Sequence, residues 1–242
     1  MTNIVLYDLA QRTEPSRCWS FNVWKTRMAL NYKKIPFTTV WVDSNTLAPT
    51  LKSISAPTNP SSQVFEYTIP TIKLPDCSVV TDSSVIALKL EALHPSPCLH
   101  LDPELQAEAE AVVLKMLMTL LAIYVPRVVR NIVNESAVTA FAAPREKLLG
   151  VTFEELEKKG GPQAWEAAED GFDAMKQLLT VQKVDKGPFI KGSQVCYADF
   201  ILVAAFESLH RGGEDMFEIA VGRDQAFRDL YNASSAWLQN DQ

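Results

Sequence analysis

Residues 71–94, TIKLPDCSVVTDSSVIALKLEALH, decide how the first part of the chain folds. Within them, residues 71–74 and 78–80 are short β-like runs, and the turn residues PDC between them are typical of a β-hairpin. The apolar positions that follow recur at helical spacing, and Asp82 or Ser83 is well placed to cap that helix. The stretch therefore predicts two strands and a helix in immediate succession.

Upstream of the hairpin, residues 3–9 and 37–42 are rich in β-branched and aromatic residues, and each predicts a strand. Between them, residues 24–33 carry apolar side chains at helical spacing with basic residues interspersed. A segment of helix-like character separates the second strand from the hairpin. Together these elements predict a small α/β domain with a mixed sheet over residues 1–93.

Residues 94–103, HPSPCLHLDP, hold three prolines and no periodicity, and they predict a linker between two domains. Beyond the linker the pattern is helical, which predicts an all-α domain over residues 104–242. Its expected helices are residues 104–133 with a kink at Pro126, 144–159 starting at Pro144, 162–183, 196–210 and 223–238. The nearly all-apolar run 196–210 is expected to be the buried central helix, and the join of the domains is expected to form a ligand cleft.

The composition disfavours several classes of function. The chain has 242 residues, of which 47% are hydrophobic and 21% charged, as in ordinary soluble globular proteins. Its formal net charge of -6 disfavours nucleic acid and anionic membranes as partners. The most apolar segment, residues 111–126, is interrupted by Lys115 and is short for a bilayer, so we expect a buried helix and no membrane span.

The cysteines also limit the possibilities. No C-x-x-C pair and no zinc-site spacing with a histidine occurs, so no metal site is predicted. The four cysteines do not form the pattern of a disulfide framework, which indicates a reducing compartment. The start of the chain lacks the basic and then apolar pattern of a signal peptide. We therefore expect a cytoplasmic protein.

Three local features point to a binding site at the domain join. Ser20 lies near the start of the first predicted helix, where unpaired N–H groups and the helix dipole favour negative charge, so its hydroxyl can donate to a thiolate. Pro70 is a candidate cis-proline that would turn the backbone groups of Ile69 toward an extended, peptide-like ligand. The carboxylate of Asp82 can bind an ammonium group. The hydroxyl of Ser83 and the N–H groups at the start of its helix can bind a carboxylate.

Each feature also has a purely structural interpretation. Ser20 and Asp82 can serve only as helix caps, and Pro70 can be a trans-proline at the start of a strand. The three features in combination describe a site for a small zwitterionic peptide that carries a thiol.

Three motifs carry a resemblance to the glutathione transferase superfamily. SFNVWKTRMAL (20–30) resembles the pattern S-P-x-x-x-K-x-R-x-A-L, whose serine activates glutathione, and IPTIKLPDCSVVTDSSVI (69–86) resembles the segment with the cis-proline and the acidic–serine pair that binds the γ-glutamyl group. GSQVCYADF (192–200) resembles the capping box and hydrophobic staple of the sixth helix of the family. The resemblance covers essentially the whole chain. It implies a thioredoxin-like domain followed by an all-α domain, glutathione as the cofactor, and a homodimer.

The form W-S-x-N-x-W-K-T-R, followed by ALNYKKIPF and WVD, is most similar to a fungal serine-type branch related to the bacterial β-etherases, and some fungal members serve secondary-metabolite pathways. Two departures stand out. Phe21 replaces the proline that commonly follows the serine, which is expected to reshape the substrate wall. Cys196 replaces the Ser or Thr expected three residues before Asp199, so we expect that helix start to be weaker by up to about 1 kcal/mol, with Ser193 as a candidate replacement.

The resemblance implies that Ser20 keeps the glutathione thiol ionised for attack on an apolar electrophile. Lys52 is a candidate partner for the glycine carboxylate of glutathione. The candidate wall residues for the electrophile are Trp19, Phe21, Tyr124 and Arg127.

Several outcomes stay open at this level. The attack can yield a conjugate, a cis–trans isomer through reversible addition to a conjugated enone, or cleavage of an aryl ether. Cys18 is an alternative nucleophile, as in the thiol-transferase branches, although Ser20 and not Cys18 stands nine residues before Ala29, as the family register requires. A third alternative is a non-catalytic glutathione-binding regulatory module, because fold does not determine function.

Overall fold

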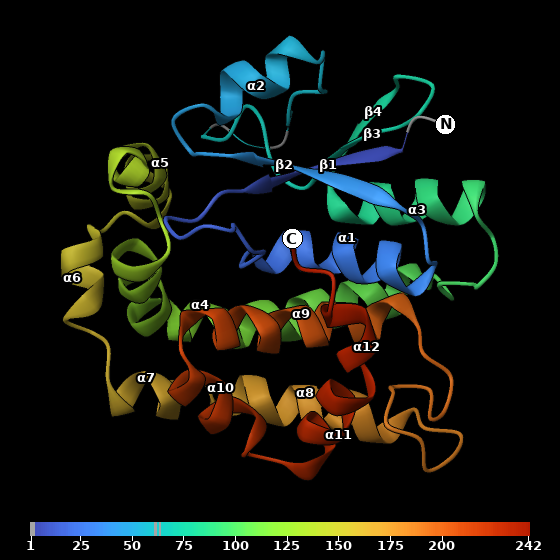
Figure 1. Ribbon diagram of the computed structural model, residues 1–242. Helices are drawn as coiled ribbons and strands as arrows, with labels where there is room; N and C mark the ends of the chain where they lie inside the picture. The colour runs from blue at the N-terminus through green and yellow to red at the C-terminus, as the bar shows by residue number, and fades with distance from the viewer. Residues whose placement is uncertain (1–2, 61, 63) are drawn as a thin grey trace.

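A mixed four-stranded sheet lies at the centre of the N-terminal half of the described chain (Figure 1). The computed structural model describes residues 3–60, 62 and 64–242. The strand order is β2-β1-β3-β4, with β1 parallel to β2 and antiparallel to β3, and β3 antiparallel to β4. The predicted mixed sheet and hairpin are confirmed. The strands are β1 Ile4–Leu9, β2 Phe37–Val42, β3 Thr71–Lys73 and β4 Val79–Thr81.

Helices cover both faces of this sheet. In Figure 1, α1 (Phe21–Tyr32) and α3 (Ser83–Leu93) lie on one face, and α2 (Leu47–Ser53) lies on the other. Helix α1 is buried almost all round because the sheet covers one side and α9 (Tyr197–Gly212) packs on another. The buried side chains include Lys25 and Arg27 as well as apolar residues, which explains why the apolar stripe of this helix is weak.

The second half contains only helices among its described elements. Helix α9 is its centre, because nearly all of its side chains are buried and it packs on α1, α4 and α10. The prediction of a buried central helix is confirmed. The helices are α4 Pro103–Asn131, the 3-10 turn Glu135–Ala137, α5 Val138–Leu149, α6 Phe153–Glu157, α7 Pro162–Ala167, α8 Glu169–Val181, α9, α10 Glu214–Val221, α11 Gln225–Ala233 and α12 Ser235–Leu238.

The predicted helix 144–159 is wrong. Pro144 does not start a helix but lies inside α5, which ends at Gly150 with the left-handed φ of 70° that favours glycine. A second helix, α6, begins after Thr152, whose hydroxyl accepts the N–H of Glu155. The stop at the glycine and the cap at the threonine divide the segment into two helices.

Helix α4 is long and apolar enough to cross a membrane by length and composition alone, with a mean hydropathy of 1.9 over its best window. The expectation that its apolar stretch is too short is wrong, because the helix has 29 residues. Its packing supports a place in the interior: Val113, Met116 and Leu120 are fully buried, and the helix contacts α8 and α9. Pro126 lies inside α4.

The capping box expected at the start of α9 is present between Cys196 and Asp199, with a thiol in place of the usual hydroxyl. The Asp199 carboxylate accepts the backbone N–H of Cys196 at 2.8 Å, the thiol of Cys196 at 3.2 Å and the N–H of Ile190 at 2.8 Å. The thiol therefore donates to the cap, and Asp199 supplies the acceptors. Ser193 does not take over, since its hydroxyl donates to Asp185.

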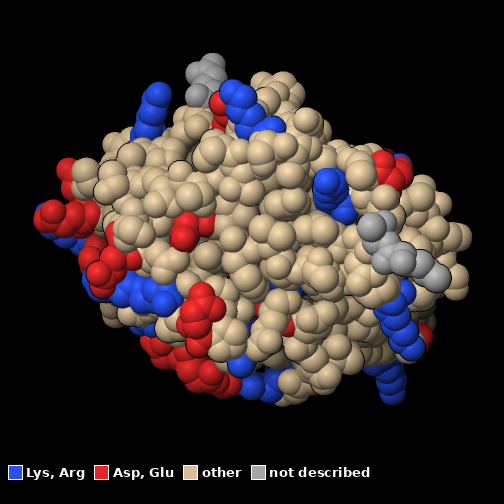
Figure 2. All heavy atoms as spheres, turned by 45° about the horizontal axis from the view of Figure 1, so that its top comes forward, with Lys and Arg blue, Asp and Glu red and all other residues tan. Residues whose placement is uncertain are grey.

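The two halves share one hydrophobic core, and the linker and the last residues of the chain are among the segments that join them. Residues 94–102 lead from α3 to α4 without regular structure and are fixed by Leu99, whose carbonyl accepts the N–H of Tyr197 at 2.8 Å. The last residues return to α1 (Figure 1), where the Gln242 carbonyl accepts from Arg27 at 3.0 Å. On the face shown in Figure 2, Lys and Arg are scattered among uncharged atoms and form no continuous basic patch.

Candidate functional site

A cleft of about 430 Å³ lies where the N-terminal ends of α1 and α3 meet the side of α4. Five of the residues predicted from the sequence line it, and α4 contributes a wall from the second half of the chain. The lining residues are Phe21, Asn22, Lys25, Asn59, Thr68, Ile69, Pro70, Asp82, Ser83, Ser84, Glu110 and Leu114.

The start of α3 presents a carboxylate and a helix N-terminus to this cleft. One oxygen of Asp82 accepts the N–H groups of Ser84 at 2.8 Å and Val85 at 3.2 Å, so Asp82 caps the helix. Asp82 is exposed, and its second oxygen stays available to a ligand. Its φ of 80° is unusual for a residue with a side chain, and such positions concentrate at functional sites. Ser83 is buried, and its carbonyl accepts the Tyr197 hydroxyl at 3.0 Å.

The segment before β3 supplies free backbone groups. The peptide bond between Ile69 and Pro70 is cis. The carbonyl of Pro70 accepts the N–H of Asp82 at 3.2 Å, which ties this segment to the start of α3. In the described part of the chain, no hydrogen bond involves the N–H or the carbonyl of Ile69. An extended peptide can therefore pair with Ile69 as an added strand would.

Ser20 is the N-cap residue of α1, and its side chain is uncommitted. Its carbonyl accepts the N–H of Trp24 at 3.0 Å, but its hydroxyl makes no capping hydrogen bond. Ser20 is half-buried and directly precedes Phe21, which lines the cleft. The hydroxyl is thus free to donate to a group that sits at the positive end of the helix dipole.

The surroundings of Cys18 argue against its alternative role as a nucleophile. It is fully buried, and its N–H donates to the carbonyl of Asp241 at 2.8 Å. Burial, followed by the nearby Asp8 carboxylate, raises the pKa of the Cys18 thiol, which keeps it protonated. The thiol-transferase interpretation therefore lacks an accessible thiolate.

Lys25 and Glu110 belong to the cleft but were not predicted as site residues. The Lys25 ammonium lies 2.6 Å from the Glu110 carboxylate and 4.4 Å from the centre of the Phe21 ring. Burial lowers the pKa of Lys25, and the carboxylate of Glu110 opposes this. Phe21, at the position where proline was expected, thus shapes the wall through its ring. Lys25 occupies the lysine position of the motif, whereas nothing in the sequence links α4 to this place.

The predicted wall residues Trp19 and Tyr124 are not among the residues that line the cleft. The Trp19 ring is buried 5.9 Å from the ring of Phe141, and its carbonyl accepts the Tyr124 hydroxyl at 3.4 Å. Burial raises the pKa of Tyr124. Lys52 is exposed on α2 and is not among the residues that line the cleft, so its predicted role stays a prediction.

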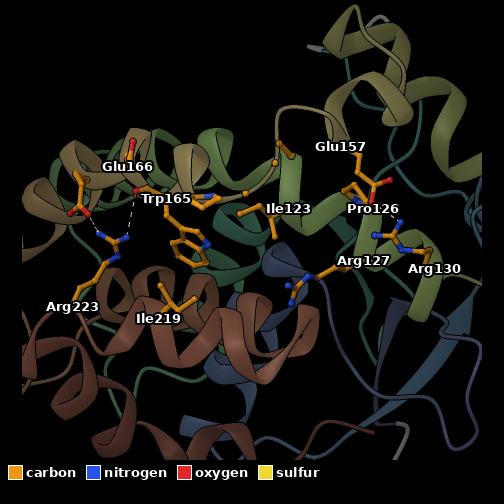
Figure 3. A pocket seen from close by; sticks show the side chains of 14 residues that line it. Ile123, Pro126, Arg127, Arg130, Glu157, Trp165, Glu166, Ile219 and Arg223 are labelled. Atoms are coloured by element: carbon orange, nitrogen blue, oxygen red, sulfur yellow. Dashed lines mark hydrogen bonds and ion pairs between the residues drawn. The ribbon is translucent and has the colours of Figure 1, made fainter.

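Arg127 lies elsewhere than expected. It forms a two-pronged ion pair with Asp215, at 2.5 and 2.7 Å, and lines a second cavity of about 700 Å³ in the helical half (Figure 3). Figure 3 shows the Trp165 ring turned toward Ile219 across this cavity. Each arginine on its wall has a carboxylate partner, and Pro70 does not line it. Ser20 is among the lining residues of neither cavity and reaches the edge of the smaller cleft through its neighbour Phe21.

The chemistry therefore points to the smaller cleft. Two helix N-termini, a carboxylate and the free backbone of Ile69 converge there, and this set suits a charged peptide. No group of three or more His, Cys, Asp or Glu among the residues that the structure describes could hold a metal ion.

Comparisons with known proteins match both halves. Residues 19–93 match the family model "Glutathione S-transferase, N-terminal domain", and residues 105–220 match "Glutathione S-transferase, C-terminal domain". The glutathione S-transferase-like protein ustS of Aspergillus flavus is 31% identical, over 93% of this chain and 86% of that protein.

Solved structures match along nearly the full length. Glutathione transferase GSTFuA3 from Phanerochaete chrysosporium has a TM-score of 0.87 and 27% identity, with 98% of each chain covered. A glutathione S-transferase of Ceriporiopsis subvermispora, in complex with glutathione, has a TM-score of 0.85 and 25% identity, also with 98% of each chain covered.

Proposed function

Because the chain belongs to the glutathione S-transferase family, we propose that its cleft binds glutathione and that Ser20 holds the glutathione thiol as a thiolate for attack on an electrophile. The observation that carries the proposal is the meeting of the α1 and α3 N-termini on one cleft, with a free Ser20 hydroxyl at the first and Asp82 at the second. The relative from Ceriporiopsis subvermispora, which was solved with glutathione, supports the ligand.

In this proposal each end of the peptide has a partner in the cleft. The cysteinyl backbone of glutathione pairs with the free N–H and carbonyl of Ile69. The γ-glutamyl ammonium lies on the free oxygen of Asp82, and the γ-glutamyl carboxylate lies at Ser83 and the N-terminus of α3. This arrangement directs the thiol toward α1.

The reaction then depends on the charge of the sulfur. The Ser20 hydroxyl donates a hydrogen bond to the sulfur, and together with the positive end of α1 it favours the thiolate, so the thiol proton leaves to solvent. The thiolate forms a bond to the β-carbon of a conjugated enone, and the α-carbon takes a proton. If the adduct persists, the product is a conjugate. If the C–S bond breaks after rotation about the former double bond, the α-proton leaves and the isomer and glutathione are released.

Ser20→Ala tests the role of the hydroxyl. A hydrogen bond to a charged group contributes enough that we expect kcat/KM to fall by roughly 10–100-fold, with a raised pKa of the bound thiol measured by thiolate absorbance. Cys18→Ser is the matched control and should leave turnover nearly unchanged. The reverse pattern, with Cys18→Ser inactive and Ser20→Ala active, would return the chemistry to Cys18.

The remaining outcomes differ in what they consume. Conjugation removes free thiol, isomerisation leaves glutathione unchanged while the isomer ratio moves, and ether cleavage releases a phenol. Assays of a panel of electrophiles for loss of free thiol, change of isomer ratio and release of phenol distinguish the three reactions. Retention on immobilised glutathione with no turnover on the whole panel would favour the non-catalytic binding module.

A homodimer is part of the proposal. Val85 and Leu88 on α3 and Leu114 and Met118 on α4 are large apolar side chains that are about half exposed, as on a surface that a second copy covers. Light scattering coupled to size exclusion should give twice the chain mass, and Leu88→Glu should shift the protein toward the monomer. A monomeric wild-type protein would refute this part.

The place of the reaction in the cell is also a proposal. All four cysteines are free, which supports a reducing compartment such as the cytoplasm.

The resemblance to fungal members supports a role in secondary metabolism. Metabolite profiles after gene deletion test this role, and an unchanged profile would count against it.

A further inference from the structure

Arg145 is a half-buried cation with no carboxylate beside it in the described part of the chain. It lies in α5, where its guanidinium donates to the carbonyl of Phe141 at 2.7 Å. Its central carbon lies 3.8 Å from the centre of the Phe141 ring and 5.4 Å from that of Phe65. The guanidinium thus lies within contact range of two aromatic rings, with donor groups left over.

The absence of an acidic partner distinguishes this side chain from the buried bases of the same protein. Lys25, Arg27 and Lys33 each have a carboxylate oxygen at 2.6–3.0 Å. A charge removed from water is costly unless it is paired, so proteins normally provide a partner. Burial lowers the pKa of Arg145 to about 10, so the group is still charged at neutral pH but poorly solvated.

The position of Arg145 connects it to the proposed reaction centre. The Phe141 ring lies 5.9 Å from the Trp19 ring, and Trp19 is bonded directly to Ser20. Phe65, the second ring near the cation, belongs to the segment that leads to Ile69 and the cleft. The buried Trp19–Phe141 pair therefore connects Ser20 at one end with the unpaired positive charge of Arg145 at the other.

We propose that Arg145 binds a carboxylate on the second substrate, so that the electrophile is an aromatic or conjugated acid and not a wholly apolar molecule. The inference rests on the proposed function, since it places the electrophile between the thiol at Ser20 and the half-buried guanidinium of Arg145. A planar guanidinium matches a carboxylate in two-pronged geometry, and the flanking rings suit a flat, unsaturated body attached to that group.

The test compares one electrophile in two charge states. Benzylideneacetone with a para-carboxylate and its methyl ester carry the same enone, so they differ chiefly in the charge offered to Arg145. We expect the wild-type protein to favour the acid by roughly 10–100-fold in kcat/KM, as for hydrogen bonds to a charged group. In Arg145→Met the preference should disappear while ester turnover changes by less than about twofold. Equal loss for acid and ester, or a preference that survives the substitution, would overturn the proposal.

Two further measurements keep the result interpretable. The finished glutathione adducts of the acid and the ester can be titrated by tryptophan fluorescence, which reads the acid preference even if no turnover occurs. Ser20→Ala with the ester tests the proposed function alone, because the ester does not use the charge of Arg145. If Arg145→Met does not fold, Arg145→Lys replaces it, because lysine keeps the charge but cannot form the two-pronged contact of a guanidinium. The preference for the acid should then fall, and an unchanged preference would count against the proposal.

Discussion

Replacing Arg27 by methionine is expected to lower the free energy of unfolding by about 3–5 kcal/mol. Arg27 and Asp8 are fully buried, and their charged groups lie 3.0 Å apart at the junction of α1 and β1. Coulomb's law at an effective dielectric constant of about 20 gives an attraction of about 5 kcal/mol at this separation. Removal of the cation leaves the Asp8 carboxylate buried with the N–H of Leu9 at 2.7 Å as its nearest donor.

The pH dependence of this loss follows from Asp8. Burial raises the pKa of Asp8, and Arg27 opposes that rise. Without Arg27 the pKa of Asp8 is expected to rise further, and a carboxyl whose folded pKa lies above its unfolded value loses stability as the pH rises through that interval. Arg27→Met should therefore be more damaging at neutral pH than at acid pH.

Urea denaturation followed by tryptophan fluorescence measures both effects. Asp8→Asn combined with Arg27→Met removes both charges, and the double variant should be more stable than Arg27→Met alone, with a coupling energy of about 1–3 kcal/mol. Arg130→Met removes an exposed ion pair with Glu157 and is the matched control, expected to change stability by about 0.5 kcal/mol or less. A loss below about 1 kcal/mol for Arg27→Met, or strictly additive effects, would refute the reasoning.

Three further predictions concern other positions. Asp82→Asn should keep the α3 cap and weaken glutathione binding by calorimetry, whereas Asp82→Ala should also cost about 1 kcal/mol of stability; unchanged binding in both would remove Asp82 from the site. Gly171→Ala would place a Cβ 2.8 Å from the backbone of Met116, so thermal denaturation should show a loss of about 1–3 kcal/mol, and a neutral result would mean that α8 can move. The hydrogen bond to Glu207 raises the pKa of His210, so its stabilisation is full below about pH 6.5 and is lost as the pH rises through the raised value. The difference in urea midpoint between wild type and His210→Gln should shrink from about pH 6 to about pH 9, and a constant difference would contradict this.

Local patterns predicted much of the fold because their physical causes are local. The turn residues between β3 and β4, and the cap at Asp82, lie within a few residues of the elements they start or end. The apolar spacing predicts the first helix from residue 24, whereas α1 begins at Phe21, because the carbonyl of Ser20 accepts the first helical hydrogen bond and its side chain gives no capping signal. The predicted helix from Pro144 is wrong because Gly150 ends α5 in the left-handed conformation, six residues after that proline.

Contacts between distant segments were harder to predict. Tyr124 and Arg127 are three residues apart on α4, which places them on similar faces but does not identify their partners. Tyr124 reaches the carbonyl of Trp19, whereas Arg127 pairs with Asp215. Arg145 was missed because its surroundings come from Phe65, which is far away in the sequence. Such pairs depend on the packing of whole helices.

The return of the final residues to α1 has a consequence for the exchange of parts between relatives. Asp241 accepts the N–H of Cys18, and Gln242 accepts from Arg27, so residues at the far end of the sequence complete the surroundings of the first helix. A chimera with a single crossover in residues 94–102 would join the first helix of one parent to the last residues of the other. Recombination of this fold therefore needs two crossovers, with the tail inherited together with the helix that it covers.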